Sequence, residues 1–191
     1  FLSLPATIAL LVGSNDITSA LFGYGKFNES SVSNSANALY YFALGLPAFA
    51  FIKVFSNFFF ANQDTKTPFY ISLASVLLNI LISIYFFRSI GFIIIPIATS
   101  ISSWFNTIIL FLILKKRSLF NFNSIFMNRF FKIILSSIFM GALFYYLLIL
   151  FQYELAFDQT FKSFYLILSV VAWAATAPSV TWPFDETVGP K

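Results

Sequence analysis

Residues 69–114 read FYISLASVLLNILISIYFFRSIGFIIIPIATSISSWFNTIILFLIL, and Arg88 is the only charged residue among them. Arg88 and Gly91 divide the segment into two apolar runs, 69–87 and 91–114. A helix rises about 1.5 Å per residue, so each run is long enough, or nearly so, for a hydrocarbon core of about 30 Å. Membrane strands need only about 10 residues and alternate in polarity. The segment therefore predicts two transmembrane helices joined by a turn.

Similar apolar runs fill nearly all of the chain. The candidate spans are 2–22, 37–60, 69–87, 91–114, 130–151 and 163–180. Between the second and third spans, residues 62–68 form a polar stop that ends with a proline suited to start a helix. The predicted fold class is an all-α integral membrane protein with about six transmembrane helices.

The composition supports the membrane class independently of the span boundaries. Hydrophobic residues make up 59% of the chain and charged residues 9%, whereas a soluble domain usually carries about 25% charged residues. The absence of cysteine and histidine removes disulfides, thiol nucleophiles, imidazole bases and the usual zinc ligands. We therefore expect a protein that is not an enzyme and has no catalytic residues.

The basic residues indicate how the chain is oriented. The net charge is +4, but the basic residues gather in one connector, as is usual beside cytoplasmic lipid headgroups. We therefore expect membrane lipids as partners, and no nucleic acid. The connectors after the second and fourth spans hold Lys66, Lys115, Lys116, Arg117, Arg129 and Lys132, and the others hold Lys26, Arg88 and Lys162. The positive-inside rule places connectors 61–68 and 115–129 in the cytoplasm.

Two positions in the second span have competing interpretations. Lys53 lies about 10 Å from the cytoplasmic end of its helix, so its ammonium either extends to the interface or has a functional role inside the protein. Pro47, close to Gly45, is expected to weaken or kink the helix because proline removes a backbone hydrogen bond.

Three polar residues of the third and fourth spans form a candidate site. Asn79 and Ser83 are four residues apart on one helical face, and Thr99 lies in the next span. Their oxygens are suited to a small cation, but hydrogen bonding between helices is a common alternative for such residues in membranes. The spacing alone favours the alternative.

The start of the chain suggests a piece of a longer protein, and its end is consistent with a truncated last helix or a tail that is not native. The chain begins at Phe1 and enters an apolar segment at once. After Trp173 the Phe/Ile/Leu/Asn bias is lost, and residues 181–191 are expected to form an irregular tail with no assigned role.

The second span and the connector after it resemble a known family. The run from Ala43 through Lys53 to the connector with Asp64, Thr65, Thr67 and Pro68 is similar to the hallmark segment of the MurJ (MviN) family, bacterial flippases for the peptidoglycan precursor lipid II. Residues 4–6 and 21–27 also resemble this family, so the resemblance covers about residues 1–117.

The resemblance implies a two-lobe transporter of the MOP exporter superfamily with fourteen helices. This chain would supply its last six: four helices of the second lobe (1–117) and two additional transmembrane helices (118–180), followed by the tail. The missing N-terminal half would be its partner and would hold the cavity arginines that bind substrate. No substrate-binding residue is therefore assigned here.

The resemblance also implies a sodium site. The family pattern places ligands at Asn79, at a backbone carbonyl near Ile95 and at Thr99, whereas the position matching Ser83 is often acidic. Sodium is the only cofactor that the sequence suggests.

The implied function is the flipping of lipid II across the bacterial inner (cytoplasmic) membrane by alternating access, for cell wall synthesis. Two alternatives remain open from the sequence. One is a MOP exporter of another substrate, such as a polysaccharide-lipid flippase or a cation-coupled drug antiporter. The other is a membrane scaffold without transport activity.

Overall fold

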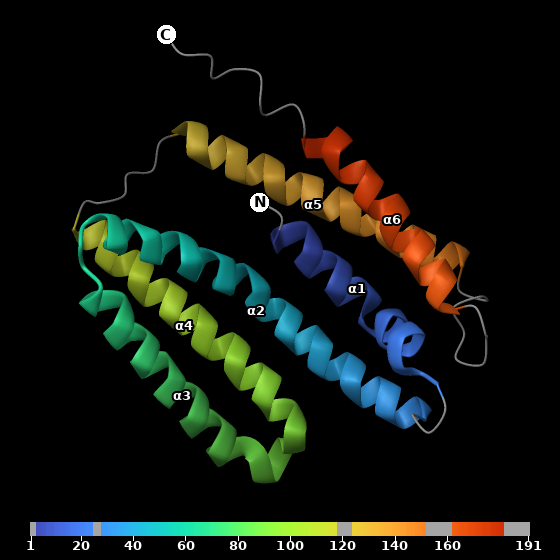
Figure 1. Cartoon of the computed structure of the whole chain (residues 1–191), viewed down its shortest axis with the longest axis horizontal. Coiled ribbons are helices and arrows are strands. Elements are labelled where there is room, and N and C mark those ends of the chain that lie inside the picture. Colours follow the sequence, from blue (N-terminus) through green and yellow to red (C-terminus); the bar gives the residue numbers. More distant parts are fainter. Residues whose placement is uncertain (1–2, 25–27, 118–123, 152–161, 182–191) are drawn as a thin grey trace. The chain divides into compact units, whose positions relative to one another are not determined.

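The computed structural model describes residues 3–24, 28–117, 124–151 and 162–181 (Figure 1). These segments are almost entirely helical and contain no strand, so the predicted all-α class is confirmed. The elements are α1 (Ser3–Phe22), α2 (Glu29–Ala61), α3 (Lys66–Ile90), the 3-10 turn η1 (Gly91–Ile93), α4 (Ile94–Lys116), α5 (Ser124–Leu150) and α6 (Lys162–Thr181).

Four stretches of the described residues are long and apolar enough to cross a membrane. They are Ser3–Phe22, Glu29–Ala61, Lys66–Lys116 and Phe131–Leu150, and a shorter apolar helix covers Lys162–Ala175. The third stretch has 51 residues, far more than the roughly 20 that one span needs. Because it turns back at η1, it supplies two spans, α3 and α4.

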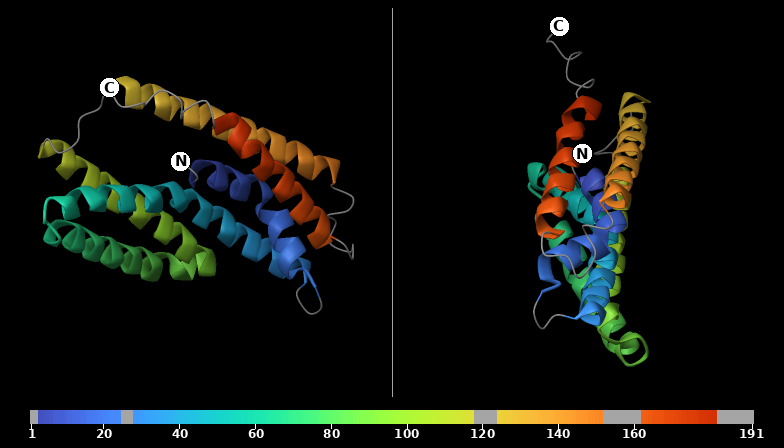
Figure 2. Two further views of the ribbon diagram at one scale, coloured as in Figure 1. Left: turned by 45° about the horizontal axis from the view of Figure 1, so that its top comes forward. Right: turned by 90° about the vertical axis from the view of Figure 1, so that its right-hand side faces the viewer.

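Gly91 makes the turn between α3 and α4 possible. Its φ is 74°, a backbone conformation that side chains disfavour, and its N–H bonds to the carbonyl of Phe87. The two helices consequently run back along each other, as Figures 1 and 2 show. The prediction of separate spans at 69–87 and 91–114 is thereby confirmed.

Two helices begin earlier than the sequence suggested. α2 starts at Glu29, not near residue 37, because the side chain of Asn28 caps its first turn. The Oδ1 of Asn28 accepts hydrogen bonds from the backbone N–H of Ser31 at 2.9 Å and from the hydroxyl of Ser30 at 2.9 Å. α5 starts at Ser124, not near residue 130. Polar residues extend both helices beyond their apolar spans.

By their packing, the helices group into two compact units: residues 37–124, and residues 1–36 with 125–191. In the first unit, a core of Phe55, Phe59, Ile71, Leu110 and Leu114 joins α2, α3 and α4. In the second unit, Ala9, Ala20, Phe144, Leu148 and Leu166 are the buried core. The predicted boundary at residues 117/118 concerns the whole transporter and stays a prediction. Residues 182–191 of the predicted tail lie outside the described residues.

In the 37–124 unit, side chains of α4 bind backbone carbonyls of α2 on both sides of Pro47. The indole N–H of Trp104 donates to the carbonyl of Leu44 at 3.0 Å, and the hydroxyl of Thr107 donates to that of Ala48 at 3.0 Å. Gly45 permits this close approach, since a Cβ there would lie 2.9 Å from the Oγ of Ser100. α2 therefore continues through Pro47 as one helix.

In the other unit, α6 caps the end of α1. The buried Lys162 donates to the carbonyl of Gly23 at 2.5 Å, and its ammonium lies 4.4 Å from the centre of the Tyr24 ring. The hydroxyl of Ser163 donates to the carbonyl of Ala20 at 2.5 Å. Helix C-termini leave carbonyls without intrahelical partners, and a cation is favourable there.

Candidate functional site

A cluster of polar side chains lies between α3 and α4, within the 37–124 unit. The amide nitrogen of Asn79 lies 3.1 Å from the hydroxyl of Thr99 and 3.3 Å from that of Ser102. The hydroxyl of Thr99 donates to the carbonyl of Ile95 at 2.8 Å, and that of Ser83 approaches the Asn79 oxygen at 3.5 Å. The structure thus brings together all four positions that the sequence singled out.

The cluster supplies neutral oxygen ligands and no charge. Its oxygens are those of one amide, several hydroxyls and one backbone carbonyl, the kinds of ligand that hard cations prefer. The described residues contain no group of three or more acidic or other metal-binding side chains. In the present geometry the Asn79 amide donates toward Thr99, so a cation between them requires the opposite amide orientation. These residues therefore offer a cation neutral oxygen ligands and no carboxylate.

Sequence reasoning missed two polar residues of α4 that extend this cluster. Ser102 is buried and accepts from Asn79. Asn106 lies one turn further along α4, and its amide nitrogen is 3.4 Å from the hydroxyl of Ser72. The buried amide oxygen of Asn106 has no hydrogen-bond partner among the described residues. Their spacing from Thr99, at i+3 and i+7, is the signal that would have found them. A buried oxygen without a partner is the kind of group that water or an ion satisfies.

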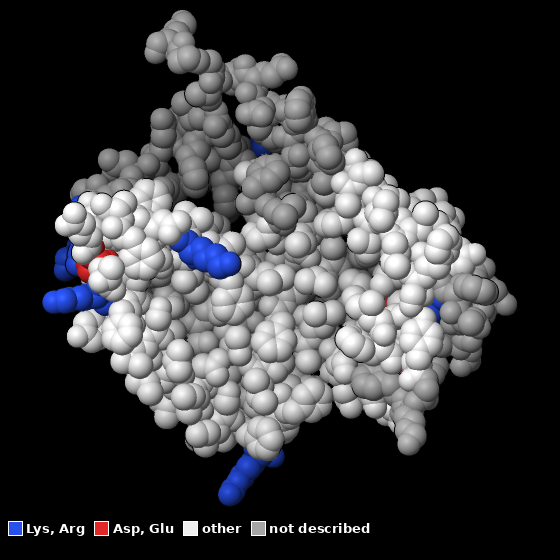
Figure 3. Space-filling model, in the orientation of Figure 1, with Lys and Arg blue, Asp and Glu red and all other residues white. Residues whose placement is uncertain are grey.

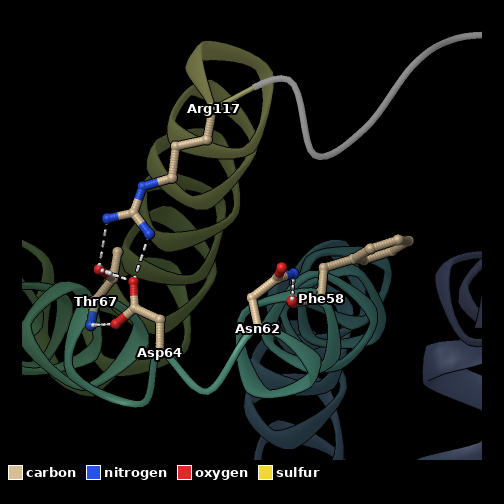
Figure 4. A network of polar contacts seen from close by, with 5 residues as sticks. All are labelled: Phe58, Asn62, Asp64, Thr67 and Arg117. Atoms are coloured by element: carbon tan, nitrogen blue, oxygen red, sulfur yellow. Dashed lines mark hydrogen bonds and ion pairs between the residues drawn. The ribbon is translucent and has the colours of Figure 1, made fainter.

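A second polar network lies where the α2–α3 connector meets the end of α4 (Figure 4). Asp64 accepts from the backbone N–H of Thr67 at 3.0 Å, from its hydroxyl at 2.7 Å and from the Arg117 guanidinium at 2.5 Å. These hydrogen bonds from Thr67, reinforced by Arg117, lower the pKa of Asp64 to about 2. The carboxylate is therefore charged at any physiological pH and joins the start of α3 to the end of α4.

The connector's backbone explains why α2 stops where it does. Gln63 has a φ of 59°, and its N–H bonds to the carbonyl of Phe60. The N–H of Asp64 bonds to the carbonyl of Phe59. This pair of bonds around a left-handed residue is the Schellman arrangement that ends helices.

The other residues of the hallmark segment differ in their surroundings. Pro68 is buried in the first turn of α3, where its missing N–H costs no helical bond. Thr65 is exposed and makes no capping bond through its side chain. Lys53 is exposed on α2. The roles of these residues in the whole protein stay predictions.

Basic side chains gather at the same end of the unit, over the end of α4 (Figure 3). Lys66, Lys115, Lys116 and Arg117 are all exposed. This arrangement agrees with the predicted cytoplasmic side, where positive residues are enriched.

The fold defines this chain as a multi-pass helical membrane protein. The family described as "Lipid II flippase MurJ" matches residues 1–166. The chain belongs to that family.

Similar proteins span several bacterial groups. The "Probable lipid II flippase MurJ" of Rickettsia prowazekii is 41% identical over 105 residues, which are 55% of this chain and 21% of that protein. The protein of the same description from Rhizobium tropici is 34% identical over 147 residues, 77% of this chain and 28% of that protein. The chain therefore spans only about a fifth to just over a quarter of the length of these relatives.

A solved structure has the same fold. The chain matches "Lipid II flippase MurJ, inward closed conformation" with a TM-score of 0.71 and 22% identity, over 95% of this chain and 36% of that one. The chain thus spans about a third of the length of that structure.

Proposed function

We propose that the full-length protein moves lipid II, the lipid-linked peptidoglycan precursor, across the bacterial cytoplasmic membrane. The observation that carries this proposal is the family match over residues 1–166, supported by relatives described as lipid II flippases. On this proposal the protein is a transporter and catalyses no covalent chemistry.

The membrane sets the physical task of such a protein. A polar headgroup cannot cross hydrocarbon without a large free-energy cost, so it needs a hydrated path through protein. We propose that two lobes rock around this path while the polyprenyl tail remains in lipid. The outward face of α3 suits contact with lipid, because its exposed side chains are apolar: Phe69, Leu73, Val76, Leu77, Ile80, Leu81 and Ile84.

The experiment is complementation of a bacterium depleted of its own lipid II flippase. We expect the full-length protein to restore growth and residues 1–191 alone to fail, because this piece spans about a quarter of its relatives and lacks most of the path. Membrane insertion of both proteins must be verified. Rescue by the piece would contradict the two-lobe mechanism, and failure of well-expressed full-length protein would contradict lipid II as substrate.

We also propose that the Asn79 cluster contributes ligands to a sodium ion in the full-length protein. The observation in favour is that Asn79, Thr99 and the Ile95 carbonyl lie within one hydrogen-bonded cluster. The charge that these residues lack would come from an acidic side chain in a part of the full-length protein outside this chain. Sodium-dependent stability is the property that tests this proposal.

A further inference from the structure

α2 carries two exposed polar side chains within its apolar span. Lys53 and Asn57 are four residues apart, so they lie on one face of the helix. Among the described residues, neither side chain has a hydrogen-bond or ion-pair partner. Polar groups inside a membrane span are costly unless they face water, protein or a ligand.

The neighbouring helix shows what a lipid-facing surface looks like in this unit. The exposed positions of α3 between Phe69 and Ile84 are overwhelmingly apolar. The face of α2 with Lys53 and Asn57 differs from that surface because it carries two polar side chains beside the exposed Phe49 and Phe60. We therefore infer that this face of α2 contacts water or a ligand and does not contact lipid.

The direction of the lysine side chain argues against simple extension to the interface. Lys53 lies seven residues, about 10 Å, before the end of the predicted span at Phe60. In a helix the Cα–Cβ bond tilts toward the N-terminus, and thus away from that nearer end. The lysine stem would have to reverse its initial direction to place the ammonium in the headgroup layer.

We propose, on the basis of the function proposed above, that Lys53 and Asn57 contact the diphosphate of the lipid-linked substrate. An ammonium is a strong point-charge partner for phosphate oxygens, and the Asn57 amide adds an N–H donor one turn away. The matched residues make up only 21% and 28% of two relatives, so other parts of the full-length protein are available to complete this site.

The test measures binding of a polyprenyl diphosphate to the full-length protein in lipid nanodiscs. Lys53→Gln should weaken binding about tenfold, the usual effect of losing a charged hydrogen bond, whereas Lys53→Arg should stay within about threefold. Asn57→Ala should weaken binding by about threefold or more. Lys116→Gln is the matched control: it removes the same charge from an exposed position at the end of α4 and should leave affinity unchanged.

Thermal stability separates a contact with substrate from a structural role. We expect Lys53→Gln to melt at the wild-type temperature in the absence of substrate. Wild-type affinity in Lys53→Gln would overturn the proposal, and so would a lowered melting temperature, which would show an ion pair within the protein. Wild-type protein that binds the diphosphate but does not transport lipid II would refute the proposed function and leave the Lys53 contact standing. No diphosphate binding by wild type would refute the contact itself.

Discussion

At the scale of single residues, Asp64 has the most sharply defined role. One of its oxygens caps the first turn of α3 through the Thr67 N–H, and the other binds both the Thr67 hydroxyl and Arg117. The carboxylate thereby connects the start of α3 to the end of α4 at the predicted cytoplasmic surface, while the backbone N–H of Asp64 bonds to Phe59 at the end of α2. A neutral side chain of the same shape keeps fewer of these contacts.

We predict that Asp64→Asn lowers the melting temperature of the full-length protein at pH 7. The folded pKa of about 2 lies below the usual 3.8, so the charged carboxylate stabilises the fold above about pH 4, and this stabilisation is lost as the pH falls toward 2. The melting-temperature difference between wild type and variant should therefore shrink in that window. Melting curves in detergent at pH 7, 5 and 3 check this; a constant difference would contradict it.

The sequence predicted part of the site at this scale, because helical spacing alone places Asn79 and Ser83 on one face. It did not predict that Ser102 accepts from Asn79. That contact depends on the register of α4 against α3, which the turn at Gly91 sets. An apolar run does not encode this register in its composition.

At the scale of elements, length and polarity predicted which helices exist, whereas their ends depended on local caps. The Asn28 cap starts α2 among serines and asparagines that resemble a loop in composition. At the other end, Gln63 takes a left-handed conformation that more commonly belongs to glycine. Neither feature has a hydrophobic signal. The sequence therefore places the start of α2 near residue 37 and not at Glu29, whereas the polar stop after residue 60 locates its end at Ala61 to within one residue.

The next prediction concerns the response of the α3–α4 hairpin to sodium. In the full-length protein, Asn79→Ala and Thr99→Val should each reduce or abolish the rise in melting temperature caused by sodium relative to potassium. Both variants should also lose about 1 kcal/mol of stability regardless of the salt, since they break a hydrogen bond between the helices or within α4.

The matched control for this prediction is Thr107→Val. The Thr107 hydroxyl donates to the carbonyl of Ala48 at 3.0 Å and takes no part in the Asn79 cluster. This variant should lose stability but keep the wild-type response to sodium. An unchanged sodium response in both Asn79→Ala and Thr99→Val would leave helix packing as the whole role of the cluster.

At the scale of the whole molecule, the distribution of basic residues predicts how the chain is oriented in the membrane. Lys66, Lys115, Lys116 and Arg117 are exposed at one end of the α3–α4 hairpin, and Arg88 is exposed at the other. Among the described residues at the end with Lys66, Lys115, Lys116 and Arg117, Asp64 is the only acidic one, and it pairs with Arg117. The excess of positive charge therefore predicts that this end faces the cytoplasm.

Single cysteines at the two ends of α3 test this orientation, because residues 1–191 contain none. Thr65 and Ser89 are exposed and lie about 36 Å apart along the helix, more than the hydrocarbon thickness of about 30 Å. In the full-length protein, with any other cysteines replaced, Thr65→Cys should react with an impermeant maleimide only after the cytoplasmic side is opened. Ser89→Cys should react in intact cells from which the outer barrier has been removed.

Because one helix separates the two positions, they must report opposite sides, and labelling of both from the same side would show that α3 does not cross the membrane. The reverse pattern would mean that the basic connectors face outward, and it would exclude the orientation that the positive-inside rule predicts.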